Sequence, residues 1–183
     1  RSRGLGDVYK RQRQRGKIMD EISGLIIKMT EFFSGDPKRI QHFIKVHTFA
    51  RVIGRAEGLD IRAMYCLDVA SVVHDIGIKP AEERYGKGQC GGKLQEQLGP
   101  EPARKMLTEL DFDEDIIDRV CFLIAHHHTY EGAQGLDWQI LLEADFLVNA
   151  FEDSLSKESI KSFRDKVFKT KTGIKMLEEM YGV

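Results

Sequence analysis

The stretch SVVHDIGIKP, residues 71–80, places a histidine beside an aspartate at the end of an apolar run. Burying a charge is costly unless a nearby group of opposite charge compensates it. Asp75 is also expected in the last turn of a helix, where a negative charge opposes the helix dipole. Both features indicate that a cation binds close to His74 and Asp75.

The sequence around this stretch predicts an all-α protein. Apolar residues recur with helical spacing, and no segment shows the sustained alternation of a half-buried strand. Helix starts are marked by Asp36 with Pro37 and by Asp60, and Gly58 marks a helix end. The glycine-rich segment YGKGQCGGK, residues 85–93, is expected to be a flexible lid or loop, because no strand precedes it. The pattern predicts helices over residues 18–34, 37–57, 61–76, 101–110, 114–128, 138–152, 157–169 and 173–180.

The chain has 183 residues, of which 42% are hydrophobic, and this predicts a single domain over residues 18–183. Residues 1–17 precede the first methionine and show neither apolar periodicity nor a capping signal. We expect this stretch to be a non-native or disordered leader. A basic arm that binds nucleic acid is the alternative.

Charge is distributed unevenly along the chain. Residues 1–16 contain six basic residues and one acidic residue, a formal charge of +5, so the remaining residues carry −6 of the total −1. Binding to a nucleic-acid duplex depends on neutralising phosphates with lysine and arginine. The acidic body therefore argues against a duplex as partner, and a phosphorylated ligand would need a bound cation.

Cysteine usage and hydropathy bear on the compartment. The three cysteines form no close pair, which is typical of a reducing cytoplasm. The early apolar run ISGLII is too short for a membrane-spanning helix or a secretion signal. We therefore expect a cytoplasmic protein without a membrane partner, and a homo-oligomer remains open.

Three predicted helices carry polar side chains on their apolar faces. His47 follows the stripe of the second helix, His74 that of the third, and Asp145 interrupts an apolar face near residues 138–148. One buried histidine is usually satisfied by a carbonyl group, and one buried aspartate by a cap or an ion pair. Four such groups, counting Asp75, would each need a buried partner. A metal ion satisfies them together.

The segment CFLIAHHHTYEG, residues 121–132, contains three consecutive histidines. Consecutive residues point to different sides of a helix, so at most two of them can aim at one centre. The apolar stripe favours His126 and His127. His128 is expected at a solvated helix C-terminus, where a positive charge is favourable.

The order of His47, the His74–Asp75 pair and Asp145 resembles the HD-domain superfamily of metal-dependent phosphohydrolases, with HDIG at residues 74–77. The resemblance implies a helical bundle of about seven to nine helices, with its core at about residues 36–152. It also implies a site for one or two metal ions. His47, His74, Asp75 and Asp145 would be the primary ligands.

Members of this superfamily with two metals usually carry a further histidine between the HD pair and the later histidines. Here EQLGPEPAR, residues 96–104, stands at that place, with Glu96 in the histidine's position. Glu96 either ligates a second ion together with Asp75, His126 and His127, or acts as a general base, or is a solvated acid. The histidine cluster also resembles part of the HD-GYP phosphodiesterases, but the GYP motif is absent.

Imidazole and carboxylate ligands with open water positions favour Fe, Mn, Co or Ni over a closed zinc site, and Mg is also compatible. The resemblance implies hydrolysis of a phosphate ester in a nucleotide or small phosphorylated metabolite by a metal-activated water. Asp75 and Glu96 are the expected catalytic residues, and Arg51 and Lys79 the expected phosphate contacts. An HD-type di-iron oxygenase and a non-catalytic metal or nucleotide sensor are the alternatives.

Overall fold

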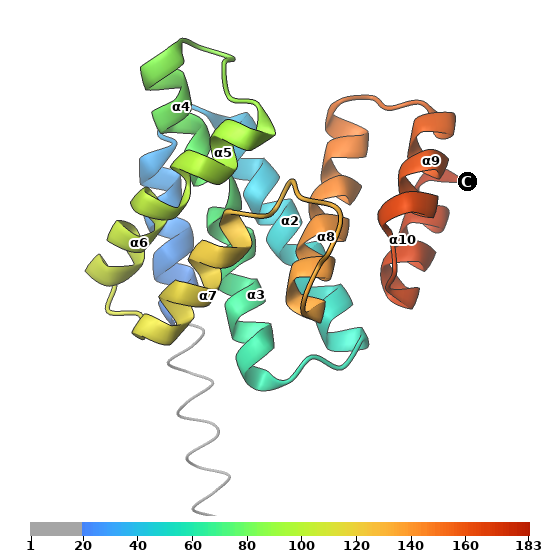
Figure 1. Ribbon diagram of the computed structural model, residues 1–183, viewed down its shortest axis with the longest axis horizontal. Helices are drawn as coiled ribbons and strands as arrows, with labels where there is room; N and C mark the ends of the chain where they lie inside the picture. Colours follow the sequence, from blue (N-terminus) through green and yellow to red (C-terminus); the bar gives the residue numbers. More distant parts are fainter. Residues whose placement is uncertain (1–19) are drawn as a thin grey trace, which may run out of the picture.

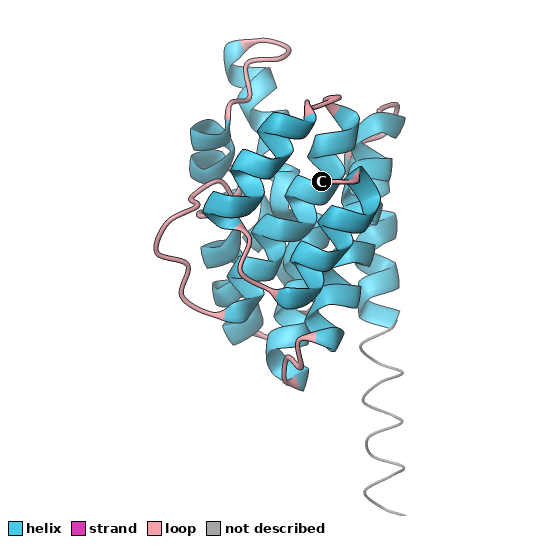
Figure 2. Ribbon diagram, turned by 90° about the vertical axis from the view of Figure 1, so that its right-hand side faces the viewer, coloured by secondary structure: helices cyan, strands magenta, loops and turns pink. Residues whose placement is uncertain are grey.

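The computed structural model describes residues 20–183 and shows a helical bundle (Figure 1). Helices and their connecting loops make up this described part, which contains no strand (Figure 2). The predicted all-α fold is confirmed. The leader predicted for residues 1–17 lies outside the described residues. Within residues 20–183, every helix is too short or too polar to cross a membrane.

Residues 20–32 are helical, and the elements that follow them alternate with short turns. They are α2 (Pro37–Ala56), α3 (Ile61–Val73), the 3₁₀ turn η1 (His74–Gly77), α4 (Ile78–Tyr85), α5 (Gly92–Leu98), α6 (Pro100–Glu109), α7 (Glu114–Ile124), α8 (Leu136–Glu152), α9 (Lys157–Val167) and α10 (Lys171–Tyr181).

The ends of α2 and α3 follow the predicted capping signals. The Asp36 carboxylate accepts a hydrogen bond of 3.1 Å from the N–H of Arg39, and Pro37 is the first residue of α2. Gly58 follows α2 with φ of +77°, a conformation that glycine adopts without strain. Asp60 caps α3 through a hydrogen bond of 2.8 Å to a backbone N–H. These local interactions explain why both helices begin where the sequence predicts and why α2 ends close to the predicted residue.

The predicted helix over residues 61–76 is wrong at its end, because α3 stops at Val73 and the HDIG residues form η1. Helices α4 and α5 were not predicted. The contact between η1 and the end of α5 is close, because a Cβ on Gly77 would lie 2.6 Å from the carbonyl oxygen of Gln95 and 2.9 Å from the nitrogen of Gly99. Glycine at position 77 therefore allows η1 to contact the α5–α6 junction directly.

Helices α2, α3 and α8 pack against one another at the centre of the bundle, and α7 covers α3. Helices α4, α5 and α6 lie on one side in Figure 1, and α9 and α10 lie beyond α8 on the other. The core contains fully buried side chains from all of the central helices, including Phe43, Ile53, Leu67, Leu123 and Leu141. The polar residues of interest come from α2, η1 and α8, with further ones from the turn after α7.

Candidate metal centre

Three buried side chains from three different elements converge inside the bundle: His42 of α2, His74 of η1 and Asp145 of α8. Asp145 Oδ1 lies 3.2 Å from His42 Nε2 and 3.5 Å from His74 Nε2. The two imidazole Nε2 atoms are 3.3 Å apart. Ligand atoms bound about 2.1 Å from one ion are separated by roughly 3–3.5 Å. These three atoms therefore have the spacing of ligands around one cation.

Asp75 lies between this group and a second one. Its Oδ2 atom is 3.5 Å from His42 Nε2 and 3.6 Å from His74 Nε2. Its Oδ1 atom is 3.5 Å from His127 Nε2. Asp75, His127 and His128 form the second group of converging donor atoms. One carboxylate therefore faces two sets of imidazoles with its two oxygens.

The second group contains a buried nitrogen without a hydrogen-bond partner. His127 Nδ1 donates a hydrogen bond of 2.6 Å to the carbonyl oxygen of Ile124. In the neutral ring, Nε2 then carries a lone pair. This Nε2 atom is buried and makes no hydrogen bond. Because buried polar atoms are rarely left unsatisfied, a cation beside Asp75 fits the residues present.

Electrostatics in the first group also fit a cation. Burial disfavours ionisation of Asp145, but hydrogen bonds from His42 and His74 hold its pKa well below the usual range. Burial likewise opposes the charge on His42, yet the hydrogen bond to Asp145 and nearby carboxylates raise the pKa of His42 to about 9. The protein thus stabilises positive charge here, and a metal ion would supply the same charge.

The histidine of α2 at the cluster is His42, and the prediction of His47 is corrected. Five residues along a helix correspond to a rotation of about 140°, so the two imidazoles cannot face one centre. His47 Nε2 lies instead 3.1 Å from Asp68 Oδ1, and Arg51 Nη1 donates a hydrogen bond of 2.9 Å to Asp68 Oδ2. His47 and Arg51 therefore connect α2 to α3 and do not reach the cluster.

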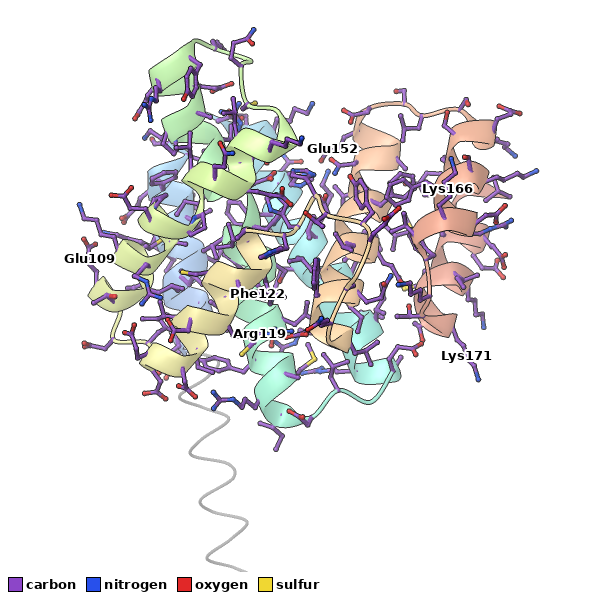
Figure 3. All side chains as sticks on the ribbon, in the orientation of Figure 1. Glu109, Arg119, Phe122, Glu152, Lys166 and Lys171 are labelled. Atoms are coloured by element: carbon purple, nitrogen blue, oxygen red, sulfur yellow. The ribbon has the colours of Figure 1, made fainter. Side chains whose placement is uncertain are left out.

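The histidine run behaves differently from the prediction because α7 ends at Ile124, and residues 125–128 form a turn. His126 donates from Nδ1 to the carbonyl oxygen of Phe122 at 2.7 Å, and its ring lies 4.3 Å from that of Phe122, labelled on α7 in Figure 3. His126 thus lies outside both groups of donor atoms. The second group contains His127 and His128, whereas the prediction paired His127 with His126.

Glu96 holds the histidine turn in place and does not belong to either group of donor atoms. Its Oε1 atom accepts hydrogen bonds of 2.9 Å from the N–H of His128 and from Thr129 Oγ1. The neighbouring Gln95 faces the second group, with its Oε1 atom 3.2 Å from His128 Nε2. Gln95, and not the predicted Glu96, therefore lies beside the second group of donor atoms.

Lys79 points away from the cluster. Its Nζ atom donates a hydrogen bond of 3.0 Å to the carbonyl oxygen of Phe32. The same atom lies 4.8 Å from the centre of the Phe32 ring. The predicted phosphate contact through Lys79 is therefore not supported by its position.

A cavity of about 530 Å³ opens onto the cluster, and His42, Asp75 and His128 form part of its wall. Other parts of the wall come from two cationic residues, two aromatic residues and one amide: Lys38, Arg39, Tyr130, Phe146 and Asn149. The volume suits a small organic ligand. Such a ligand would lie directly against the converging donor atoms.

Comparison with protein-family models gave a match to the HD domain over residues 39–164, which is more than half of the chain. A comparison with curated proteins gave no match. All of the converging residues lie within the matched segment, from His42 at its start to Asp145 near its end. The chain belongs to the HD-domain family, whose members are generally metal-dependent hydrolases.

Proposed function

We propose that this protein hydrolyses a phosphate ester of a nucleotide or a small phosphorylated metabolite with the help of a divalent metal ion. The convergence of His42, His74 and Asp145 from three helical elements carries the proposal. Their burial at the bottom of a cavity supports binding of both an ion and a substrate. The family membership agrees with this class of reaction.

The ligands of the ion would be His42, His74 and Asp145, together with Asp75. A bound divalent ion supplies Lewis acidity towards a phosphate oxygen and acidifies water at neutral pH. Asp75 lines the cavity, so its carboxylate would accept a hydrogen bond from an attacking water and orient it. Glu96 would act indirectly, because its Oε1 atom holds the turn that carries His128.

The donor set favours Mn, Fe, Co or Ni, and Mg is compatible. Imidazole donors suit the transition metals, and the two carboxylates suit harder ions. Asp75, His127 and His128 would form a second ion site beside the first. Only one of these three groups is anionic, and Asp75 is shared with the first site. We therefore expect the first ion to bind more tightly than the second.

The wall of the cavity supports a nucleotide as substrate. Phe146 and Tyr130 present aromatic surface to the cavity, and Phe163 packs behind them with its ring stacked on Phe146 at 3.7 Å. An aromatic wall of this kind would stack on a base. Lys38 would contact phosphate in the role first expected for Lys79 and Arg51, because the guanidinium of Arg39 is paired with Glu82.

A matched pair of variants on one helix tests the proposal. The protein is purified without chelator, its metal content is measured, and phosphate release is assayed with Mn, Fe, Co or Ni on a panel of nucleotides and phosphodiesters. His42→Ala should lose bound metal and activity, whereas His47→Ala should keep both. Metal-loaded protein that leaves the whole panel intact would contradict the proposal. Oxygen consumption by an iron-loaded sample would instead favour an HD-type oxygenase, and nucleotide binding without turnover a sensor.

A further inference from the structure

The three buried imidazoles near the cluster are oriented in two different ways. His74 Nδ1 donates to the carbonyl oxygen of Ser71 at 3.0 Å, and His127 Nδ1 donates to that of Ile124 at 2.6 Å. Both partners are backbone atoms of the preceding helical turn. His42 Nδ1 instead lies 3.0 Å from the Oε2 atom of Glu152, a side chain 110 residues away in sequence. The Nδ1 atom of His42 is therefore held by a distant side chain and not by the backbone of its own helix.

The geometry points to Glu152 as a positioning residue that holds His42 with its Nε2 lone pair directed at the cation site. This inference rests on the proposed function, because it assigns a partner to one proposed ligand. An ionised carboxylate only accepts hydrogen bonds, so His42 Nδ1 must carry the proton. In the neutral ring, Nε2 is then free to bind a metal. A carboxylate that accepts from Nδ1 also makes Nε2 a stronger electron-pair donor to a metal ion.

The contact between Glu152 and His42 follows from the helical spacing of residues on α8 and on α2. Glu152 is seven residues after Asp145 on α8, which places both carboxylates on the same face of that helix. Lys45 is three residues after His42 on α2, and its Nζ atom forms an ion pair with Glu152 Oε1. Each oxygen of Glu152 thus has its own partner on α2. Glu152, the last residue of α8, is labelled in Figure 3.

The burial of Glu152 makes the contact specific. Its side chain is 10% exposed, although its neighbours Phe151 and Asp153 are exposed. A carboxylate is rarely buried without a purpose-built partner. The Lys45 side chain is 39% exposed, so an ion pair with Lys45 alone would not require this burial. The hydrogen bond to His42 is the buried half of the interaction.

Binding of Mn²⁺, measured by calorimetry on the full chain, tests the inference through three variants. Removing an orienting partner of a metal-binding histidine typically weakens metal binding 10- to 100-fold. Glu152→Ala should therefore weaken Mn²⁺ binding by about that factor. Glu152→Gln keeps an oxygen that can accept from His42 Nδ1, so it should recover most of the affinity. Asp153→Ala removes an equal charge from the next position and should bind Mn²⁺ like the wild type.

The visible absorption of Co²⁺-loaded protein gives a second readout, because it reports the ligand geometry directly. We expect an altered spectrum for Glu152→Ala and a wild-type spectrum for Asp153→Ala, with thermal unfolding confirming that each variant is folded. Equal Mn²⁺ affinity and equal Co²⁺ spectra for Glu152→Ala and wild type would overturn the inference and leave the proposed function standing. A wild-type protein that binds neither ion would overturn both.

Discussion

Replacing Gly77 with alanine tests whether close packing, rather than flexibility, explains the last residue of HDIG. Gly77 has φ of −68° and ψ of −15°, which any residue adopts. Alanine in this conformation would stabilise the protein by about 0.4–1 kcal/mol if space allowed it. The new Cβ would however lie 2.6 Å from the carbonyl oxygen of Gln95 and 2.9 Å from the nitrogen of Gly99.

Both contacted atoms belong to the backbone, so relief requires movement of η1 away from α5. Overpacking of this kind typically costs 1–3 kcal/mol. The cost exceeds the gain, and we expect Gly77→Ala to lower the free energy of unfolding by roughly 1–2 kcal/mol. For a chain of this length, the unfolding midpoint should fall by about 2–8 °C. Because η1 carries His74 and Asp75, metal affinity should fall as well.

Gly24→Ala is the matched control, because Gly24 lies within the helix of residues 20–32 and a Cβ there would meet no atom within 4 Å. This variant should raise the free energy of unfolding by about 0.5–1 kcal/mol. Thermal and urea unfolding of both variants measure whether each substitution raises or lowers the free energy of unfolding. If Gly77→Ala stabilises the protein as Gly24→Ala does, close packing is not the reason for glycine at position 77.

Three further substitutions probe separate parts of the chain. Asp68→Asn weakens the buried contact with Arg51 and should cost roughly 1–3 kcal/mol in urea unfolding without changing metal stoichiometry. Glu143→Gln places an amide where a carboxylate accepts the N–H of Thr170 at 3.0 Å, and hydrogen exchange at the start of α10 should accelerate. Gln95→His adds an imidazole beside the second group, and titration calorimetry should show tighter binding of a second equivalent of Mn²⁺.

The fold and the convergence of His74, Asp75 and Asp145 could be predicted because their signals are local. Helical spacing and the caps at Asp36 and Asp60 depend on residues a few positions apart. His74, Asp75 and Asp145 interrupt apolar runs, and the structure brings all three together. Their roles as ligands remain part of the proposed function.

The choice between His42 and His47 required knowledge of the packing of α2. This helix contacts both α3 and α8, so it is buried over more than one narrow stripe. Ile44, three residues before His47 and on its face of the helix, is 40% exposed, so this face is not the most buried one. Val46 and Ile53, both fully buried, lie on the face that includes His42. A stripe aligned on these two residues would have selected the correct histidine.

The histidine turn and the two short helices were missed for a different physical reason. Helix α7 ends four residues before His128, whereas the predicted helix continued to residue 128. Its end is stabilised by tertiary contacts, because Glu96 binds the N–H of His128, and Trp138 Nε1 donates to the carbonyl oxygen of His126. Contacts between residues so far apart in sequence leave no periodic signal.

The ends of two helices explain why the centre would attract a cation even without its ligands. His74 is the residue at the C-terminus of α3, and His127 follows the end of α7 by three residues. Unpaired carbonyl groups give each helix C-terminus a partial negative charge. The same carbonyls accept the Nδ1 protons of both imidazoles and so direct Nε2 towards Asp75. The negative charge of Asp75 between these two ends favours a positive partner, and a divalent ion bound by the facing imidazoles would provide one.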